Sequence, residues 1–156
     1  MSWTKLNFGK HNGKTFPQVM FIDPDWFFWA YDKQVFKNRG NLQKEANEIF
    51  NKSTNIKIPQ EGEETLVAEY GIHPLSQNSV GFELVEQRRQ VHQGSTAVFR
   101  RSVIDLSRPR QIDGYDKLGH KMFLHNLKYY LFGNEKTKMT KKRCEEFFSN
   151  NSNFEL

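Results

Sequence analysis

The sequence predicts a small α+β protein built around an aromatic core. The chain has 156 residues, which is the size of one domain. Its 22 aromatic side chains, 14 of them Phe, are too apolar for a disordered chain. Segments with helical periodicity flank a region rich in Val, Phe, Ile and Leu, as an α+β chain would have. We therefore expect a single domain over residues 1–156, with a soft boundary separating 1–58 from 65–156.

The N-terminal part reads as a strand, a glycine turn and two helices. Residues 4–8 alternate polar and apolar side chains, which predicts a half-buried strand, and the glycines of residues 9–13 predict a tight turn. Apolar side chains within residues 15–22 then recur at helical spacing, which predicts a short helix. Asp23 is an N-cap acceptor before a proline, so a helix should begin there. Its consecutive aromatics at 26–31 are the predicted centre of the core.

The middle of the chain predicts a helix followed by strands. Asn41 can cap a helix running to about Ser53, and residues 55–64 resemble a linker. The stretches 65–72, 80–86 and 96–106 are typical of strands. We expect an antiparallel hairpin or small sheet, with a loop at residues 93–95.

Two helices are predicted to complete the fold. Apolar side chains recur at helical spacing over residues 115–132, and Gly133 is a natural helix end. A shorter helix is expected over residues 140–148. The polar stretch 149–153 that follows should fray.

Charge is distributed unequally along the sequence. Residues 1–78 hold nine basic and nine acidic side chains, whereas residues 79–156 hold fourteen and nine, so the net charge of +5 lies in the second half. A pI near 9.3 favours polyanionic partners, nucleic acid first. It is equally consistent with an ordinary solubility charge.

Cysteine content and hydropathy indicate the cellular compartment in which the protein is expected. Cys144 is the single cysteine, which excludes an internal disulfide framework and fits a reducing environment. No apolar run approaches a membrane span, and the first ten residues lack the pattern of a secretion signal. The sequence therefore predicts a cytoplasmic protein without membrane attachment.

The densest polar motif is Gly9-Lys10-His11-Asn12-Gly13-Lys14-Thr15. It imitates a nucleotide-binding P-loop, but it is one residue short between its glycines, and Pro17 disturbs the helix that should follow. Two cations beside exposed loop amides nevertheless suit a phosphate. We predict Lys10, His11 and Lys14 as nucleic-acid-binding residues, the alternative being that the lysines are merely solvated.

The same region resembles a known family. Residues 8–16, followed by Val19 and by Asp23-Pro24-Asp25-Trp26-Phe27-Phe28-Trp29-Ala30, are similar to the F-G-K-x-x-G-K-x-[FILV]…D-P-x-[YW]-[FL]-x-W pattern. That pattern marks the small C-terminal-like domain of exodeoxyribonuclease X. The resemblance covers about residues 6–36 and implies an association with nucleic-acid processing. It implies no nuclease activity, because the exonuclease's catalytic carboxylates belong to a different domain.

Arginines recur on or beside the predicted hairpin. Arg89 and Arg100 could share one face of paired strands, and Arg108 and Arg110 follow shortly after. Guanidinium groups clamp phosphates through paired hydrogen bonds, so these four residues complete the predicted nucleic-acid-binding set. An equally simple interpretation is a solvated strand edge.

No catalytic residues, metal ligands or cofactors are predicted. Asp23 and Asp25 could serve metal-assisted hydrolysis, but both are also suited to capping a helix. The leading hypothesis is a non-catalytic accessory protein that binds the phosphate backbone of nucleic acid. The alternative is a protein-interaction module, such as a phage or bacterial adaptor or inhibitor, that binds an acidic partner.

Overall fold

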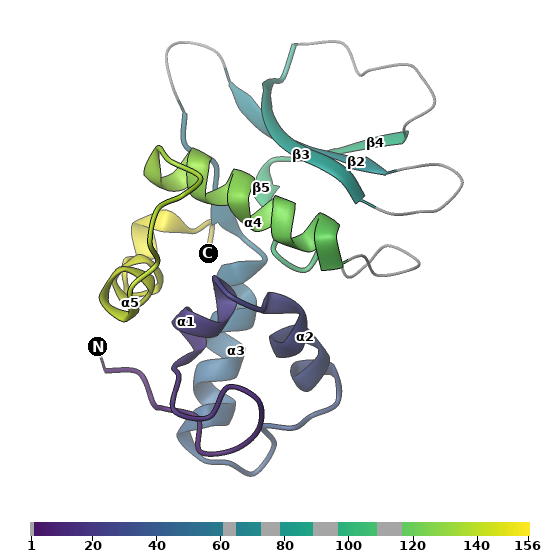
Figure 1. The fold of residues 1–156 in the computed structure, drawn as a ribbon. Coiled ribbons are helices and arrows are strands. Elements are labelled where there is room, and N and C mark those ends of the chain that lie inside the picture. The colour runs from purple at the N-terminus through teal and green to yellow at the C-terminus, as the bar shows by residue number, and fades with distance from the viewer. Residues whose placement is uncertain (1, 61–64, 73–78, 89–96, 109–116) are drawn as a thin grey trace. The chain divides into compact units, whose positions relative to one another are not determined.

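The computed structural model of the chain describes residues 2–60, 65–72, 79–88, 97–108 and 117–156. The chain divides into two compact units. Unit 1 combines residues 1–56 with residues 138–156, and unit 2 comprises residues 57–137. Helices make up unit 1, and unit 2 contains an antiparallel sheet and one long helix (Figure 1). The predicted α+β class is confirmed.

The helices of unit 1 begin where the sequence provides caps. Helix α1 (Phe16–Met20) starts with a capping box at Thr15. Helix α2 (Pro24–Asp32) starts at Asp23, whose Oδ1 accepts a hydrogen bond from the Trp26 N–H at 3.3 Å. Helix α5 (Lys141–Ser149) starts at Thr140, whose hydroxyl accepts from the Arg143 N–H at 3.2 Å. Helices α1 and α5 confirm the predicted ones to within two residues at each end, and α2 begins at the predicted cap.

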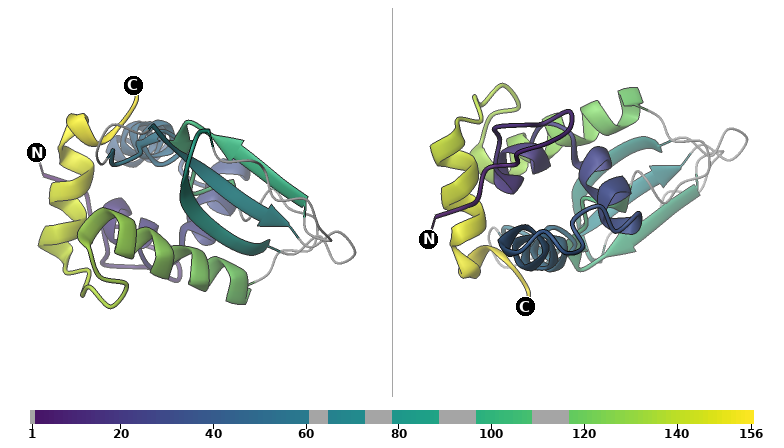
Figure 2. Two further views of the ribbon diagram at one scale, coloured as in Figure 1. Left: turned by 90° about the horizontal axis from the view of Figure 1, so that it is seen from above. Right: turned by 90° about the horizontal axis from the view of Figure 1, so that it is seen from below.

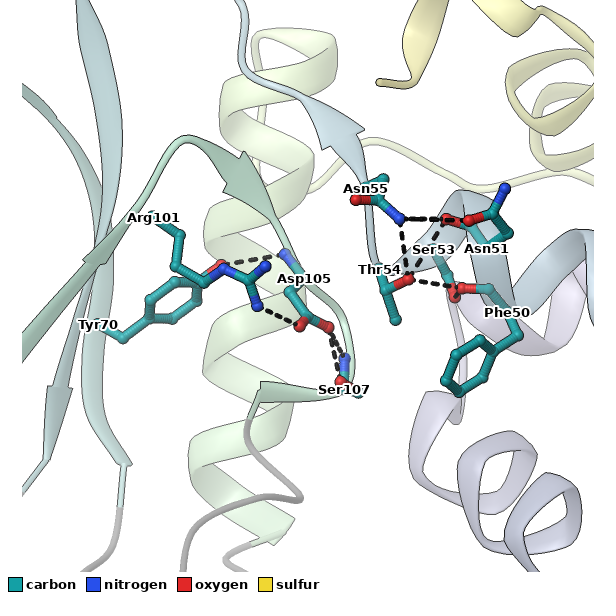
Figure 3. A network of polar contacts seen from close by, with 9 residues as sticks. All are labelled: Phe50, Asn51, Ser53, Thr54, Asn55, Tyr70, Arg101, Asp105 and Ser107. Atoms are coloured by element: carbon teal, nitrogen blue, oxygen red, sulfur yellow. Dashed lines mark hydrogen bonds and ion pairs between the residues drawn. The ribbon is translucent and has the colours of Figure 1, made fainter. Parts of the chain in front are cut away.

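Helix α3 (Asn41–Ser53) has a different cap from the predicted one. Gly40, with φ 59°, occupies the N-cap position, and Asn41 is the first helical residue. At the other end of the helix, polar side chains satisfy the last carbonyls. The Thr54 hydroxyl donates to the Phe50 carbonyl at 2.8 Å, and the Asn55 amide donates to the Asn51 carbonyl at 2.8 Å (Figure 3).

The core of unit 1 is aromatic, as predicted. Its rings meet mostly edge to face, for instance Phe16 against Phe27 at 5.3 Å and against Phe36 at 5.0 Å between centroids. Helix α1 contacts α2, α3 and α5, which places it at the centre of this packing. The largest side chains with less than 2 % exposure in unit 1 are Phe16, Phe27, Phe36, Phe148, Leu6, Met20, Ile49, Ile56 and Val19.

The polar tail does not fray. Residues Asn151–Asn153 form a short 3-10 helix, η2, and Phe154 is only 3 % exposed. The Phe154 ring stacks on Phe148 with 5.5 Å between centroids, and its backbone bridges to Ile56. Burial of this one aromatic ring overrides the polar character of the residues before it.

Lys52 is a buried cation in unit 1. Its side chain is 4 % exposed, and its Nζ donates to the Phe148 carbonyl at 2.7 Å, near the C-terminus of α5. The ammonium also lies 5.9 Å from the centroid of a Trp3 ring and 3.5 Å from Glu48 Oε1. A cation at this position stabilises the negative end of the α5 dipole. Lys52 thereby ties α3 to α5.

Unit 2 contains a three-stranded antiparallel sheet. Its strands are β2 (Leu66–Ile72), β3 (Ser79–Glu86) and β4 (Ala97–Arg101), in the order β3-β2-β4. Two further strands have two residues each, β1 (Ile56–Lys57) at the junction of the units and β5 (Val103–Ile104). The predicted hairpin across residues 93–95 is wrong in its pairing, because β4 pairs with β2 and not with β3. The residues 93–95 themselves lie outside the described ranges.

Helix α4 (Lys117–Phe132) runs along the sheet next to β3 (Figure 2). Tyr70 on β2 stacks on Phe123 of α4 with 6.0 Å between centroids. Buried apolar side chains from both elements complete this second core, among them Val67, Ala68, Val85, Phe123, Leu124 and Leu127. The helix ends before Gly133, as predicted.

Asp105 organises the turn after β5. Its buried carboxylate accepts from the Ser107 N–H at 2.8 Å, the Ser107 hydroxyl at 2.6 Å and Arg101 Nη1 at 3.1 Å (Figure 3). The Asp105 N–H in turn donates to the Tyr70 hydroxyl at 3.0 Å. Burial raises the pKa of Tyr70, so its phenol stays protonated. This network fixes the backbone of unit 2 beside its core.

No described helix combines the length and apolar character that a bilayer crossing requires.

Candidate nucleic-acid interface

The glycine–lysine loop, residues 6–14, has a fixed shape. Residues 4–8 are not the predicted strand, because only Leu6 makes paired backbone contacts there. The Leu6 N–H donates to the Lys14 carbonyl at 2.8 Å, and the Gly13 N–H donates to the Leu6 carbonyl at 2.7 Å. Gly9 and Gly13 have φ 75° and 89°, a region that only glycine enters without strain. The loop therefore closes on itself and exposes Lys10 and Asn12 between its glycines.

Asp23 anchors this loop to helix α2. Its Oδ2 accepts from Lys10 Nζ at 2.9 Å and lies 3.0 Å from His11 Nε2, while its Oδ1 caps Trp26. Partial burial by itself raises the pKa of Asp23, but the hydrogen bonds from Lys10, His11 and the Trp26 N–H together lower that pKa below its usual value. The carboxylate is thus ionised at neutral pH and holds three groups at once.

His11, predicted as a nucleic-acid-binding residue, faces the interior of unit 1 and offers little surface to a phosphate. Its side chain is 6 % exposed, and its ring meets Trp26 edge-on with 5.1 Å between centroids. The imidazole can bind both neighbours because its polar nitrogen hydrogen-bonds to Asp23 while its ring packs on Trp26. His11 is a structural residue that fastens the loop to α2.

Lys10 and Lys14 keep access to solvent. The Lys10 side chain is 67 % exposed even though it pairs with Asp23, and Lys14 is half-buried. An ion pair that exposed is weak and is easily exchanged for another anion. Both predicted lysines are therefore available to an external partner.

The structure adds a cation that sequence reasoning missed. The guanidinium of Arg39 lies 3.9 Å from the centroid of the Phe8 ring, and its Nε donates to the Val35 carbonyl at 2.9 Å. Phe8 also packs on Phe36, so the loop and the connection between α2 and α3 lie side by side (Figure 1). Arg39 is exposed and belongs to the surface of the loop. No spacing in the sequence signals this contact, since 30 residues separate Phe8 from Arg39.

The two units differ in net charge. Unit 1 holds twelve basic and eight acidic side chains, whereas unit 2 holds eleven and ten. The excess of positive charge thus belongs mostly to unit 1, because the basic segment 138–143 groups with the N-terminal helices and not with the sheet.

Two arginines of unit 2, Arg100 and Arg101, are bound by carboxylates of the same unit. Arg100 on β4 lies directly opposite Glu69 on β2, and Arg100 Nε donates to Glu69 Oε2 at 2.7 Å. Both side chains are mostly buried, at 18 % and 11 % exposure. Arg108 is half-buried beside the Asp105 turn. Arg89 and Arg110 lie outside the described residues.

Asp23 has the contacts of a capping residue. Both of its oxygens bind protein groups, as a capping residue's would. Within the described ranges, no three His, Cys, Asp or Glu side chains gather as metal ligands would. Cys144 is buried, and burial raises its pKa to about 12, which keeps the thiol protonated.

Comparisons with family models, with curated proteins and with solved structures find no match to this chain.

Proposed function

We propose that this protein binds nucleic acid without acting on it, and that the glycine–lysine loop of unit 1 contacts the phosphate backbone. The observation that supports this proposal is the grouping of Lys10, Lys14 and Arg39 around one closed loop. Phosphates attract such groups irrespective of base sequence.

The loop is preorganised for such contacts. Its backbone is held by the hydrogen bonds of Leu6 and by the contact of His11 with Asp23, so little conformational entropy is lost on binding. Lys10 uses one of its three N–H groups on Asp23 and can direct another to a phosphate. Arg39 is stacked on Phe8, which limits its rotamers and leaves its guanidinium edge for a second phosphate.

Arg100 and Arg101 do not carry the proposal, because Glu69 and Asp105 already bind them. The phosphate contacts therefore come from the glycine–lysine loop and Arg39.

Salt dependence of binding tests the proposal. Each lost phosphate contact flattens the slope of log affinity against log salt by about 0.7 to 0.9. Replacing Lys10 and Lys14 together by Ala should reduce the slope by up to about 2, and adding Arg39→Ala by up to about 3. A matched control with the same charge change is Lys141→Ala with Lys142→Ala, because these two lysines lie on helix α5 and not in the glycine–lysine loop.

Two results would overturn the proposal. One is that the wild-type protein binds neither single- nor double-stranded DNA or RNA at low salt. The other is that the control pair on α5 lowers the slope as much as Lys10 and Lys14 do.

A protein-interaction module that binds an acidic partner is the second candidate. It is favoured by Ile22, which is 52 % exposed immediately before the Asp23 cap and offers nothing to a phosphate. A partner that survives nuclease digestion of a host lysate, and that is lost on Ile22→Ser, would favour this function over nucleic-acid binding.

A further inference from the structure

Trp29 is the exposed member of the aromatic run on helix α2. Its side chain is 44 % exposed, whereas Phe27 and Phe28 are 0 % and 3 % exposed. Trp26, the other tryptophan of the helix, is half-buried against His11 and Phe36. The apolar ring of Trp29 therefore faces water on a helix whose other aromatic rings pack against the protein.

Trp29 lies one helical turn from Trp26, which packs on the glycine–lysine loop. Trp26 packs on that loop: its Cζ2 atom lies 3.6 Å from the place where a side-chain Cβ would be if Gly9 had one. Trp29 follows Trp26 by three residues, so the two side chains are about 60° apart around the helix axis and neighbours along it. Asp23, which holds Lys10, lies about 9 Å from Trp29 along the helix axis and about 120° from it around the axis. A strand of several nucleotides that contacts the loop can extend around the helix to the ring.

An exposed aromatic ring beside cations suits single-stranded nucleic acid. Phosphates pair with the cations, while an unpaired base stacks on the ring, and every base has a face that can stack. In a duplex the base faces are covered by their neighbours, so a duplex can use the cations but not the ring. An acidic protein segment would meet the cations equally well but carries no regular series of planar rings.

From this geometry, and resting on the proposed function, we infer that unit 1 binds single-stranded nucleic acid, with a base stacked on Trp29 and the adjoining phosphates at Lys10, Lys14 and Arg39. Binding tolerates any base sequence, because stacking reads a ring face and not a hydrogen-bonding edge. The preferred ligand is the strand with the most accessible bases.

The test compares two probes across matched variants. The probes are a labelled oligodeoxythymidine of about 12 nucleotides and a duplex of the same length, at low salt. Trp29→Ala should weaken binding of the single strand about 5- to 150-fold and leave the duplex unchanged. Trp29→Phe, which keeps a ring, should restore much of the affinity. Tyr129→Ala removes an aromatic ring of 55 % exposure from unit 2 and should change neither.

The outcomes separate this inference from the proposed function. If neither probe binds wild-type protein, the proposed function fails. If both bind and the Lys10 and Lys14 variant weakens both, but Trp29→Ala changes neither or changes both equally, the function stands and the stacking inference is refuted. A second readout is tryptophan emission, which the single strand should quench in wild-type protein and much less in Trp29→Phe. Equal quenching in the two proteins would also refute it.

Discussion

Replacing Asp23 by Ala should destabilise unit 1 by about 2 to 4 kcal/mol. Loss of the cap on Trp26 costs about 1 kcal/mol. Loss of the partner of buried His11 costs about 1 to 3 kcal/mol, because a polar atom is left unsatisfied. The exposed pair with Lys10 adds less than about 1 kcal/mol.

Urea unfolding followed by tryptophan fluorescence measures the free energy of unfolding of unit 1. All three tryptophans, Trp3, Trp26 and Trp29, belong to unit 1. The control is Lys10→Ala, which removes only the exposed partner and should cost no more than about 1 kcal/mol.

The effect should depend on pH with a definite sign. The pKa of Asp23 is lower in the folded protein than its usual 3.8, so the ionised carboxylate stabilises the fold above that value. This stabilisation is lost as the pH falls through the folded-state pKa. The difference between wild type and Asp23→Ala should therefore be constant near neutrality and shrink in acid. A cost below about 0.5 kcal/mol at neutral pH, or a cost that does not change in acid, would refute the role of Asp23.

Three further predictions concern buried polar groups. Lys52→Met keeps the apolar stem but removes the hydrogen bond to Phe148, and should lower the stability of unit 1 by about 1.5 to 3 kcal/mol in the same urea assay; an unchanged midpoint would contradict it. Arg100→Ala leaves Glu69 without its ion-pair partner and should destabilise unit 2 by about 3 kcal/mol, measured by circular dichroism, while the salt slope of nucleic-acid binding stays the same. Cys144 should resist a thiol reagent at pH 8 in the native protein and react fully in denaturant, since its pKa is about 12; labelling of native protein at the denatured rate would show an accessible thiol.

The helices were predictable because single capping residues mark where they begin or end. Asp23 before Pro24, Thr140 before α5 and Gly133 after α4 act over one turn of chain, and each marks the observed boundary. Enrichment in Val, Phe, Ile and Leu likewise located β2 and β3.

Strand order and tail docking were not predictable, because both depend on partners far apart in the chain. The local pattern does not reveal that β4 pairs with β2 on the side opposite β3. It also does not reveal that Phe154 packs on Phe148 after a polar stretch. Each outcome is decided by which apolar surfaces fit together in three dimensions.

The candidate site was only partly predictable for the same reason. Lys10 and Lys14 follow from the loop motif, but the motif does not reveal that His11 turns inward to Asp23. Arg39 contacts Phe8 only because folding brings these two distant parts of the chain together. Trp29 lies in a run of apolar residues with no periodicity, so nothing in the sequence distinguishes its face of α2 from that of the buried Phe27.

The composition of unit 1 from residues 1–56 and 138–156 has a consequence during synthesis. Three of its helices leave the ribosome early, but Phe147, Phe148 and Phe154 emerge only after the sheet-forming segment has been made. Until then the nascent helices expose the apolar surface that these rings later cover, and local contacts alone must hold them. The slow step in maturation should therefore be the closure of this helical unit by its last-made segment, and a chaperone that binds nascent chains would have its target there.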